Sequence, residues 1–172
     1  MSMMTEAQAR AILEKVVKMS VADECTASLD GSTNGNIRFA RNDVSTSGIV
    51  DDVELGVSVA FGKRSGAATI NQFDDESLER CVRRAEELAR LAPENPEFMP
   101  AIDKQAYKPS DTFSTSTAAI TPELRAKVAA ESIAASKAQS LVAAGFLEDS
   151  RGFTAFANSK GNFGYQQITG MD

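Results

Sequence analysis

One stretch of the sequence decides the fold: Asp51-Asp52-Val53-Glu54-Leu55-Gly56-Val57-Ser58-Val59-Ala60-Phe61. Its large apolar side chains occupy every second position and alternate with charged, hydroxyl or small residues. This alternation predicts a β-strand that buries one face and turns the other toward solvent or a partner. The stretch therefore predicts a sheet at the centre of a soluble domain.

Three helices are predicted around this sheet from their caps. Thr5 and Gln8 have the spacing of a capping box. Asp74 caps a second amphipathic stretch, which ends before Pro93. Thr121 begins a third, because a proline and an acid follow it in the first turn. The apolar positions expected to face the core are Ile12, Leu13, Val16, Val17 and Met19 in the first helix, Leu78, Cys81, Val82, Ala85, Leu88 and Ala89 in the second, and Leu124, Val128, Ile133 and Leu141 in the third.

Shorter strand patterns surround the long strand. They are predicted at residues 24–29, 37–39, 44–50 and 66–71 in the first half of the chain, and at residues 143–148, 152–158 and 162–168 in the second. Residues 30–35 are rich in Gly, Ser and Asn and predict a turn or loop. Residues 62–65 and 159–162 predict hairpin turns.

The order of these elements predicts an α+β fold, with an antiparallel or mixed sheet and amphipathic helices packed on one side. Residues 1–92 are expected to form a helix–β-meander–helix module. Residues 93–118 are rich in Pro, Ser and Thr and predict a linker or surface loop. Residues 119–172 predict a helix plus β-strands, the start of a second unit that is truncated at the C-terminus. We therefore expect the chain to continue in a larger protein.

A weak internal repeat accompanies this division. The dipeptide Phe39-Ala40 follows the cap Thr5 at nearly the same distance as Phe156-Ala157 follows the cap Thr121. An internal duplication of the helix–β-meander unit is one interpretation, and a chance recurrence of the dipeptide is the other.

Composition limits the chemistry that this chain can perform. The 172 residues carry a formal net charge of −6 and no histidine. The acidic balance argues against nucleic-acid binding, which needs a basic face. Without histidine, the chain has no Ser-His-Asp or Cys-His arrangement and no zinc site of the HExxH type. Its apolar runs are too short for a membrane span and its N-terminus lacks a signal-peptide pattern, so we expect a cytoplasmic protein.

The charged residues suit structural roles better than catalytic ones. The paired carboxylates at residues 51–52 and 74–75 are typical of an exposed strand entrance and a helix cap, since neighbouring strand residues point to opposite faces. The interleaved arginines and glutamates of residues 76–90 predict a solvated, ion-paired helix face. Cys25 and Cys81 are expected to be buried thiols in a reducing compartment.

Few residues remain as candidates for a functional site. Lys63 and Arg64 lie at a predicted hairpin tip, where they are free to touch an acidic partner. Asn158 lies at the end of a predicted strand. We expect no catalytic residue and no metal ligand in this chain, and we single out Lys63, Arg64 and Asn158 as interface or substrate contacts.

Several short motifs follow one another in a fixed order along the chain. The first block comprises Arg38-Phe39-Ala40-Arg41-Asn42, Val57-Ser58-Val59-Ala60-Phe61-Gly62-Lys63-Arg64-Ser65-Gly66-Ala67-Ala68-Thr69, Asn71, Ser77-Leu78 and Arg83-Arg84-Ala85-Glu86-Glu87-Leu88-Ala89-Arg90-Leu91-Ala92-Pro93-Glu94. The second comprises Ala143-Ala144-Gly145-Phe146 and Ala157-Asn158-Ser159-Lys160-Gly161. Together they resemble the N-terminal region of the TldD/PmbA family, and the likeness covers most of the chain.

This resemblance implies a function that the residues alone do not. Members of the family were named modulators of DNA gyrase and are described as cytoplasmic metallopeptidases that cut peptides and unfolded or modified precursors. The chain would then be the N-terminal substrate-chamber and assembly module of such a zinc metallopeptidase, or of its non-catalytic TldE-like subunit. The implied partners are a TldD- or TldE-like subunit in a homo- or hetero-oligomer, and a peptide or unfolded protein as substrate.

The same resemblance limits what this chain does by itself. The family's zinc motif contains histidines and lies outside the matched part, so zinc is implied for the full-length catalytic member and no cofactor for this chain. We expect no peptidase activity from the chain alone, and no nucleic-acid or membrane partner. The sheet would wall the chamber and accept an extended peptide by edge-strand addition. The alternative is a stand-alone protein-interaction or adaptor domain without enzymatic activity.

Overall fold

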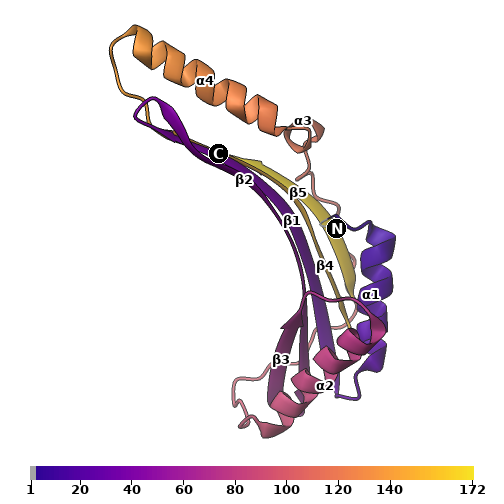
Figure 1. Cartoon of the computed structure of the whole chain (residues 1–172). Coiled ribbons are helices and arrows are strands. Elements are labelled where there is room, and N and C mark those ends of the chain that lie inside the picture. The colour runs from indigo at the N-terminus through magenta and orange to yellow at the C-terminus, as the bar shows by residue number, and fades with distance from the viewer. Residues whose placement is uncertain (1–2) are drawn as a thin grey trace.

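The structure, a computed structural model, describes residues 3–172. It confirms the α+β fold: a curved five-stranded antiparallel sheet has helices along its convex side, and none of the helices in the described residues lies on the concave side (Figure 1). The elements are α1 (Glu6–Met19), β1 (Glu24–Ala40), β2 (Asp43–Phe61), β3 (Arg64–Ile70), α2 (Asp75–Leu91), α3 (Thr115–Ala118), α4 (Pro122–Ala138), β4 (Gly145–Asn158) and β5 (Phe163–Met171). The strand order is β3-β2-β1-β4-β5.

The central strand β1 is longer than its local sequence predicts. It pairs with β2 along one edge and with β4 along the other. Gly31, inside the predicted turn, lies between Val53 and Phe153. The turn predicted at residues 30–35 is therefore wrong. Small and polar residues favour turns locally, but here two flanking strands supply the backbone hydrogen bonds that a turn would otherwise provide.

The strands on either side of β1 are also continuous. β2 runs for 19 residues, so residues 51–52 lie within it, and the predicted strand entrance at that point is wrong. β4 likewise joins the two segments that were predicted separately. The chain turns between β1 and β2 at Arg41 and Asn42, which have φ angles of 54° and 63°. Two successive positive φ angles are typical of a type I′ hairpin.

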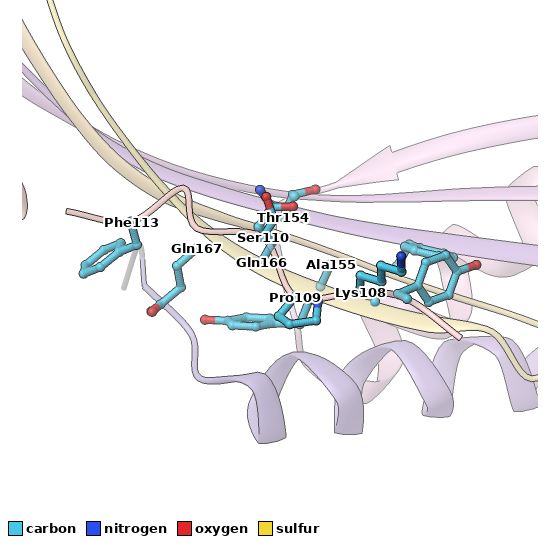
Figure 2. Close-up of a pocket in the computed structure, with 12 residues that line it drawn as sticks. Lys108, Pro109, Ser110, Phe113, Thr154, Ala155, Gln166 and Gln167 are labelled. Carbon is cyan, nitrogen blue, oxygen red and sulfur yellow. The ribbon is translucent and has the colours of Figure 1, made fainter. Parts of the chain in front are cut away.

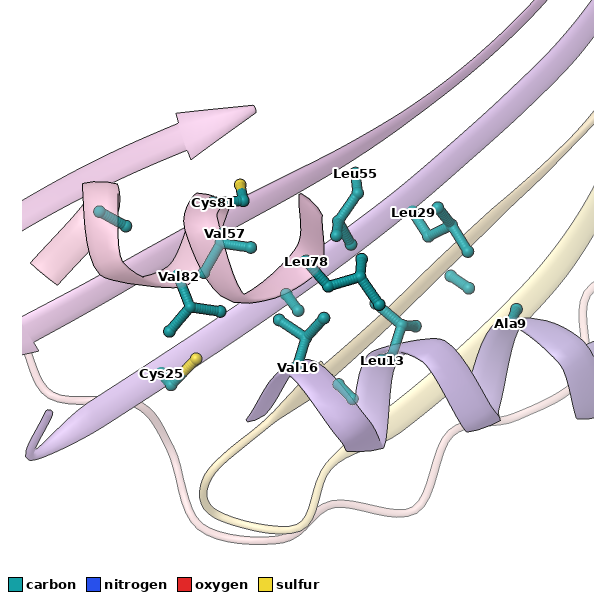
Figure 3. Close-up of a cluster of buried hydrophobic side chains, with 14 of the residues drawn as sticks. Ala9, Leu13, Val16, Cys25, Leu29, Leu55, Val57, Leu78, Cys81 and Val82 are labelled. Atoms are coloured by element: carbon teal, nitrogen blue, oxygen red, sulfur yellow. The ribbon is translucent and has the colours of Figure 1, made fainter. Parts of the chain in front are cut away.

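The main core lies at the end of the sheet where α1, α2 and β3 pack, which we call the proximal end (Figure 1). Figure 3 shows Leu13 and Val16 of α1 and Leu78 of α2 directed at Leu29 and Leu55 of the sheet. The predicted caps Thr5, Asp74 and Thr121 are all present. None of the helices in residues 3–172 has the length and hydropathy needed to cross a membrane.

The other end of the sheet, which we call the distal end, is covered by α4, with the short α3 beside it (Figure 1). The predicted apolar face of α4 is wrong in part, because Leu124 and Val128 are 45% and 37% exposed. Its buried residues are Arg125, Ala129 and Ile133. The side chain of Arg125 is 2% exposed, and its guanidinium pairs with Asp149 of β4. Its Nε and Nη2 atoms have no hydrogen-bond partner within residues 3–172.

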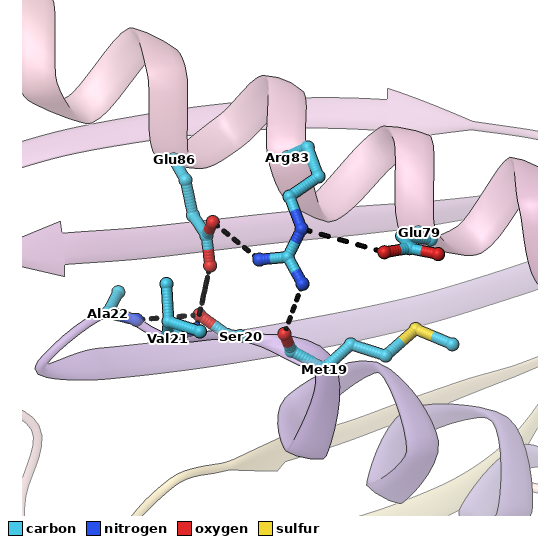
Figure 4. A network of polar contacts seen from close by, with 7 residues as sticks. All are labelled: Met19, Ser20, Val21, Ala22, Glu79, Arg83 and Glu86. Carbon is cyan, nitrogen blue, oxygen red and sulfur yellow. Dashed lines mark hydrogen bonds and ion pairs between the residues drawn. The ribbon is translucent and has the colours of Figure 1, made fainter.

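A buried carboxylate joins α2 to the segment between α1 and β1. Glu86 accepts hydrogen bonds from the Val21 amide at 2.8 Å, the Ser20 hydroxyl at 3.1 Å and the Arg83 guanidinium at 2.7 Å (Figure 4). Arg83 also donates to the carbonyl of Met19. The solvated face predicted for this helix is therefore wrong at Glu86, although the pairs Arg80–Glu76 and Arg84–Glu87 are exposed.

The packing of α4 predicts different outcomes for two glycines of the sheet. A Cβ atom at Gly35 of β1 would lie 2.2 Å from Nη1 of Arg125, whereas a Cβ at Gly48 of β2 meets nothing within 4 Å. Because Asp149 holds the guanidinium in place, Gly35→Ala should lower the free energy of unfolding by about 1–3 kcal/mol. The matched control Gly48→Ala should change it by less than about 1 kcal/mol. Urea unfolding measures both, and equal effects would contradict this account of α4.

The environment of Glu86 predicts a dependence of stability on pH. Burial by itself would raise the pKa of Glu86, but the hydrogen bonds from Val21, Arg83 and Ser20 outweigh it and hold the pKa below its ordinary value of 4.5. The ionised carboxylate therefore stabilises the fold above about pH 4.5, and this contribution is lost as the pH falls through the lowered pKa. Glu86→Gln should lower the free energy of unfolding by about 2–3 kcal/mol at pH 7, and by progressively less as the pH falls below the ordinary pKa.

Urea unfolding of the wild type and of Glu86→Gln, measured from about pH 7 to about pH 3, gives the difference in their free energies of unfolding. This pH range spans the titration of a carboxyl group. The control is Glu87→Gln, because the ion pair between Glu87 and Arg84 is exposed to solvent. If Glu86→Gln lowered the free energy of unfolding by the same amount at every pH, the charge of Glu86 would contribute nothing to stability.

Candidate functional site

The concave face of the sheet is the candidate functional site. Cys25, Ala27 and Leu29 of β1 are buried beneath the helices, so the residues between them face the concave side. The concave-facing residues of β1 are Thr26, Ser28, Asp30, Ser32, Asn34, Asn36 and Arg38. The concave side of β1 is therefore polar, in contrast to the apolar side that the helices cover.

A shallow depression of about 440 Å³ lies at the middle of the concave face. Its walls include the carboxylates of Asp30, Asp52 and Glu54, and the hydroxyl groups of Ser150 and Thr154. Glu54 lies directly opposite Asp30 in the β1–β2 ladder, and no ion pair within residues 3–172 engages either carboxylate. Like charges in opposite positions repel each other, so this part of the face has a negative potential.

Residues 93–114, which we call the strap, cross part of this face. The amide of Asn95 donates to the carbonyl of Lys63 at 2.9 Å, and the amide of Ala101 donates to the Glu24 carboxylate, also at 2.9 Å. At the far end of the strap, the amide of Thr169 in β5 donates to the carbonyl of Thr112 at 3.0 Å. The strap therefore leads from α2 across the proximal part of the concave face to the outer edge of β5.

Asn162 anchors the middle of the strap. Its side chain is buried, and its Oδ1 atom accepts hydrogen bonds from the Gln105 amide at 2.7 Å and the Tyr107 hydroxyl at 3.2 Å. Its Nδ2 atom donates to the carbonyl of Ile102 at 3.1 Å. One amide side chain in the β4–β5 turn therefore fixes three residues of the strap.

A second depression, of about 400 Å³, lies between the strap and the β4–β5 edge (Figure 2). The Tyr107 ring packs edge-on against Phe156 at 5.3 Å between centroids. Phe156 in turn lies over Gly164, where a Cβ atom would be 2.6 Å from the ring. Pro109 and Phe113 of the strap complete the apolar part of the wall. The depression thus joins an aromatic wall to the hydroxyl and amide groups of the sheet.

The residues singled out from the sequence all lie at the proximal end but do not form one site. Lys63 is exposed at the β2–β3 turn, and Arg64 faces Glu94 of the strap at 3.8 Å. Asn158 lies in β4, which β1 separates from β2. Its Oδ1 atom accepts hydrogen bonds from the amides of Lys160 and Asn162. Asn158 therefore shapes the β4–β5 turn.

Residues 3–172 contain no group of three or more His, Cys, Asp or Glu residues placed to hold a metal ion. The two cysteines are free and buried, as predicted. Burial raises the pKa of the Cys25 thiol to about 11 and also raises the pKa of Cys81. Both thiols are therefore protonated and unreactive at neutral pH.

Residues 93–118 are predicted as a linker or surface loop, but no sequence pattern indicates the path of the strap or the role of Asn162 as its anchor. Asn162 appeared only as the last residue of a predicted hairpin turn, and its partners at residues 102–107 lie far away in the sequence. The one available signal was the composition of the strap, whose prolines exclude helix and central strand. That signal does not specify which surface the strap crosses.

Comparison with known proteins agrees with this geometry. Residues 26–89 match the family model described as PmbA/TldA metallopeptidase domain 1. A search of curated proteins found no match.

Several solved structures have the same fold. TldE from Thermococcus kodakarensis superimposes with a TM-score of 0.82 at 15% identity, over 93% of this chain and 36% of that chain. A putative modulator of a DNA gyrase from Thermotoga maritima has a TM-score of 0.77 at 14% identity, over 97% of this chain and 38% of that one. A putative modulator of DNA gyrase from Bacteroides thetaiotaomicron has a TM-score of 0.74 at 16% identity, over 97% and 40%. This chain spans well under half the length of each.

The strap should come free of the sheet when its anchor is removed. Asn162→Ala deletes the acceptor for Gln105 and Tyr107 and the donor to Ile102. We expect faster amide exchange and faster proteolysis within residues 102–107, and a loss of about 2–4 kcal/mol in the free energy of unfolding. The control is Lys104→Ala, which changes an exposed side chain of the same segment. Unchanged exchange in Asn162→Ala would mean that other contacts hold the strap.

Proposed function

Residues 26–89 identify this chain as a member of the PmbA/TldD family through its first domain, and from that premise we propose that it forms a wall of a substrate chamber. The chamber would belong to a TldD/PmbA-type zinc metallopeptidase or to its non-catalytic TldE-like subunit. The substrate class would be peptides and unfolded or modified proteins. The observation that carries the proposal is the curved sheet, whose helices all lie on the convex side (Figure 1).

The chemistry of the concave face suits an extended chain better than a small molecule. Hydroxyl, amide and carboxylate groups follow one another along β1 and offer hydrogen bonds in any register. The two depressions are shallow and lie along one surface of the sheet. Polar groups spread over an open surface recognise backbone and polar side chains with little dependence on sequence, as a peptidase for unfolded proteins requires.

Hydrolysis itself is assigned to residues outside this chain. Residues 3–172 do not offer a set of ligands for zinc, so they do not fit that metal. A bound zinc ion activates water and polarises a carbonyl group, and in this proposal another part of the assembly holds it. The contribution of this chain is to bind and orient the substrate. Lys63 and Arg64 remain the proposed contacts to an acidic partner, since both lie at an exposed hairpin tip.

A second candidate function is that of a protein-interaction domain without a peptidase partner. The observation that favours it is the number of large apolar side chains left exposed at the distal end, such as Ile49, Val50 and Phe146. Exposed apolar surface of this kind is typical of protein interfaces. The two functions differ in what meets the concave face: an unfolded chain in the first, and nothing or a folded partner in the second.

Site-specific crosslinking tests the proposed chamber wall. Because Cys25 and Cys81 are buried, a single introduced cysteine can carry a benzophenone label. The label is placed at Ser32→Cys on the concave face or, as the control, at Ser132→Cys on the exposed side of α4. We expect unfolded casein to crosslink several-fold more to residue 32 than to residue 132. Equal crosslinking from both positions, or crosslinking to folded proteins alone, would rule out a chamber wall.

A further inference from the structure

The outer edge of β2 is open along its distal half. β3 pairs with residues 55–61 of β2 and extends no further. Residues 43–54 of β2 have β1 on one side and no strand on the other, within residues 3–172. The opposite edge of the sheet is different, because the strap bonds to β5 at Thr112 and Thr169. One long edge therefore presents unpaired backbone N–H and C=O groups to its surroundings.

The side chains at the centre of this edge, residues 44–50, do not protect it. Monomeric proteins shield edge strands by keeping them short or by placing charged residues, lysine above all, or proline in them. Residues 43–54 contain neither lysine nor proline, and residues 44–50 carry no charge. Val44, Ile49 and Val50 are 45%, 54% and 58% exposed. An uncharged, β-branched and exposed segment of this length favours the addition of another strand.

We propose that residues 43–54 accept an extended segment of another polypeptide as an additional antiparallel strand. The charges of the edge define the partner's chemistry. Asp43 lies at one end, and Asp52 and Glu54 lie at the other, while residues 44–50 between them are uncharged. A complementary strand has β-branched or apolar residues at its centre and lysine or arginine at both ends. No ion pair within residues 3–172 engages Asp43, Asp52 or Glu54.

In the symmetric register centred on Ser47, a second copy of the same chain fits this edge poorly. An antiparallel pair of β2 strands related by a two-fold axis at Ser47 would bring Val44 of one copy opposite Val50 of the other. The same register brings Asp43 opposite Asp51 twice. Like charges directly opposite each other destabilise a strand pair. The acidic ends therefore disfavour this register of self-association and favour a basic partner strand.

This inference does not rest on the proposed chamber. The edge shares Asp52 and Glu54 with the concave depression, but residues 43–50 lie outside it, so Ile49→Lys/Val50→Lys tests the edge without changing the depression. A failure of the chamber proposal would leave the edge proposal standing, and the reverse also holds.

Peptide binding to the full chain tests the edge. The probe is a fluorescein-labelled peptide of alternating valine and threonine with a pair of lysines at each end. Its matched analogue has glutamates in place of the lysines. We expect the lysine peptide to bind at least about tenfold more tightly than the glutamate peptide, with an affinity that falls as salt is added. The double variant Ile49→Lys/Val50→Lys should weaken its binding by a further factor of about ten or more.

Two further variants separate edge binding from general effects. Asp52→Lys removes one acidic end, and it should reduce the preference for the lysine peptide without lowering the melting temperature. Leu141→Lys changes a residue that is 61% exposed but lies outside the sheet, and it should leave binding unchanged. Equal affinity for both peptides, or loss of binding in the Leu141 variant, would overturn the proposal. So would sedimentation showing a dimer that Ile49→Lys/Val50→Lys dissociates, because the occupant would then be a second copy.

Discussion

The pairing of β1 with a strand on each side is the constraint on which the rest of the structure depends. β1 joins β2 to β4, so the elements before the strap and the elements after it share one sheet. Both edges of β1 are used along almost its whole length, which leaves the glycines and asparagines of its middle no unpaired backbone groups. The same pairing sets which residues face the helices and which face the concave side, because a shift by one residue would exchange the two faces.

The two ends of this sheet are stabilised by different interactions. At the proximal end, α1 and α2 bury a continuous apolar cluster, and Glu86 ties the two helices together through the segment between α1 and β1. At the distal end, α4 contacts the sheet through a buried arginine and two small patches at Ala129 and Ile133. A buried ion pair contributes less net stability than apolar packing of the same volume. The distal end is therefore the less stable part of the fold, and it also carries exposed apolar side chains such as Ile49 and Val50 and the open β2 edge.

Much of this fold is predictable from the sequence, and the failures share one cause. The helix caps at Thr5, Asp74 and Thr121 depend on neighbours within a few residues, and all three predictions are confirmed. The break predicted at residues 30–35 failed because strands β2 and β4, distant in the sequence, supply the hydrogen bonds there. The face of α4 was misassigned for a related reason: Gly35 leaves room for the guanidinium of Arg125, which apolar periodicity does not reveal. Of the candidate site residues predicted from the sequence, Asn158 has a structural role in the β4–β5 turn. Asn162, the anchor of the strap, was not predicted, because its contacts join segments that are distant in the sequence.

The hypothesis of an internal duplication now depends on architecture, because the dipeptides that suggested it do not correspond. Phe39 lies opposite Gly145 on the face that α4 covers, whereas Phe156 lies opposite Ser28 on the concave face, against Tyr107. Equivalent residues of two repeats in one sheet must share a face, so the two Phe-Ala pairs are not equivalent.

The element order is nevertheless symmetric: α1 precedes β1 and β2, α4 precedes β4 and β5, and the two first strands lie side by side at the centre. In a duplicated unit, β3 would have a counterpart beyond β5, and in residues 3–172 the strap bonds to β5 at that position. The edge of β2 along residues 43–54 has no such cover within residues 3–172, so the two outer edges of the sheet differ in what an added strand would meet.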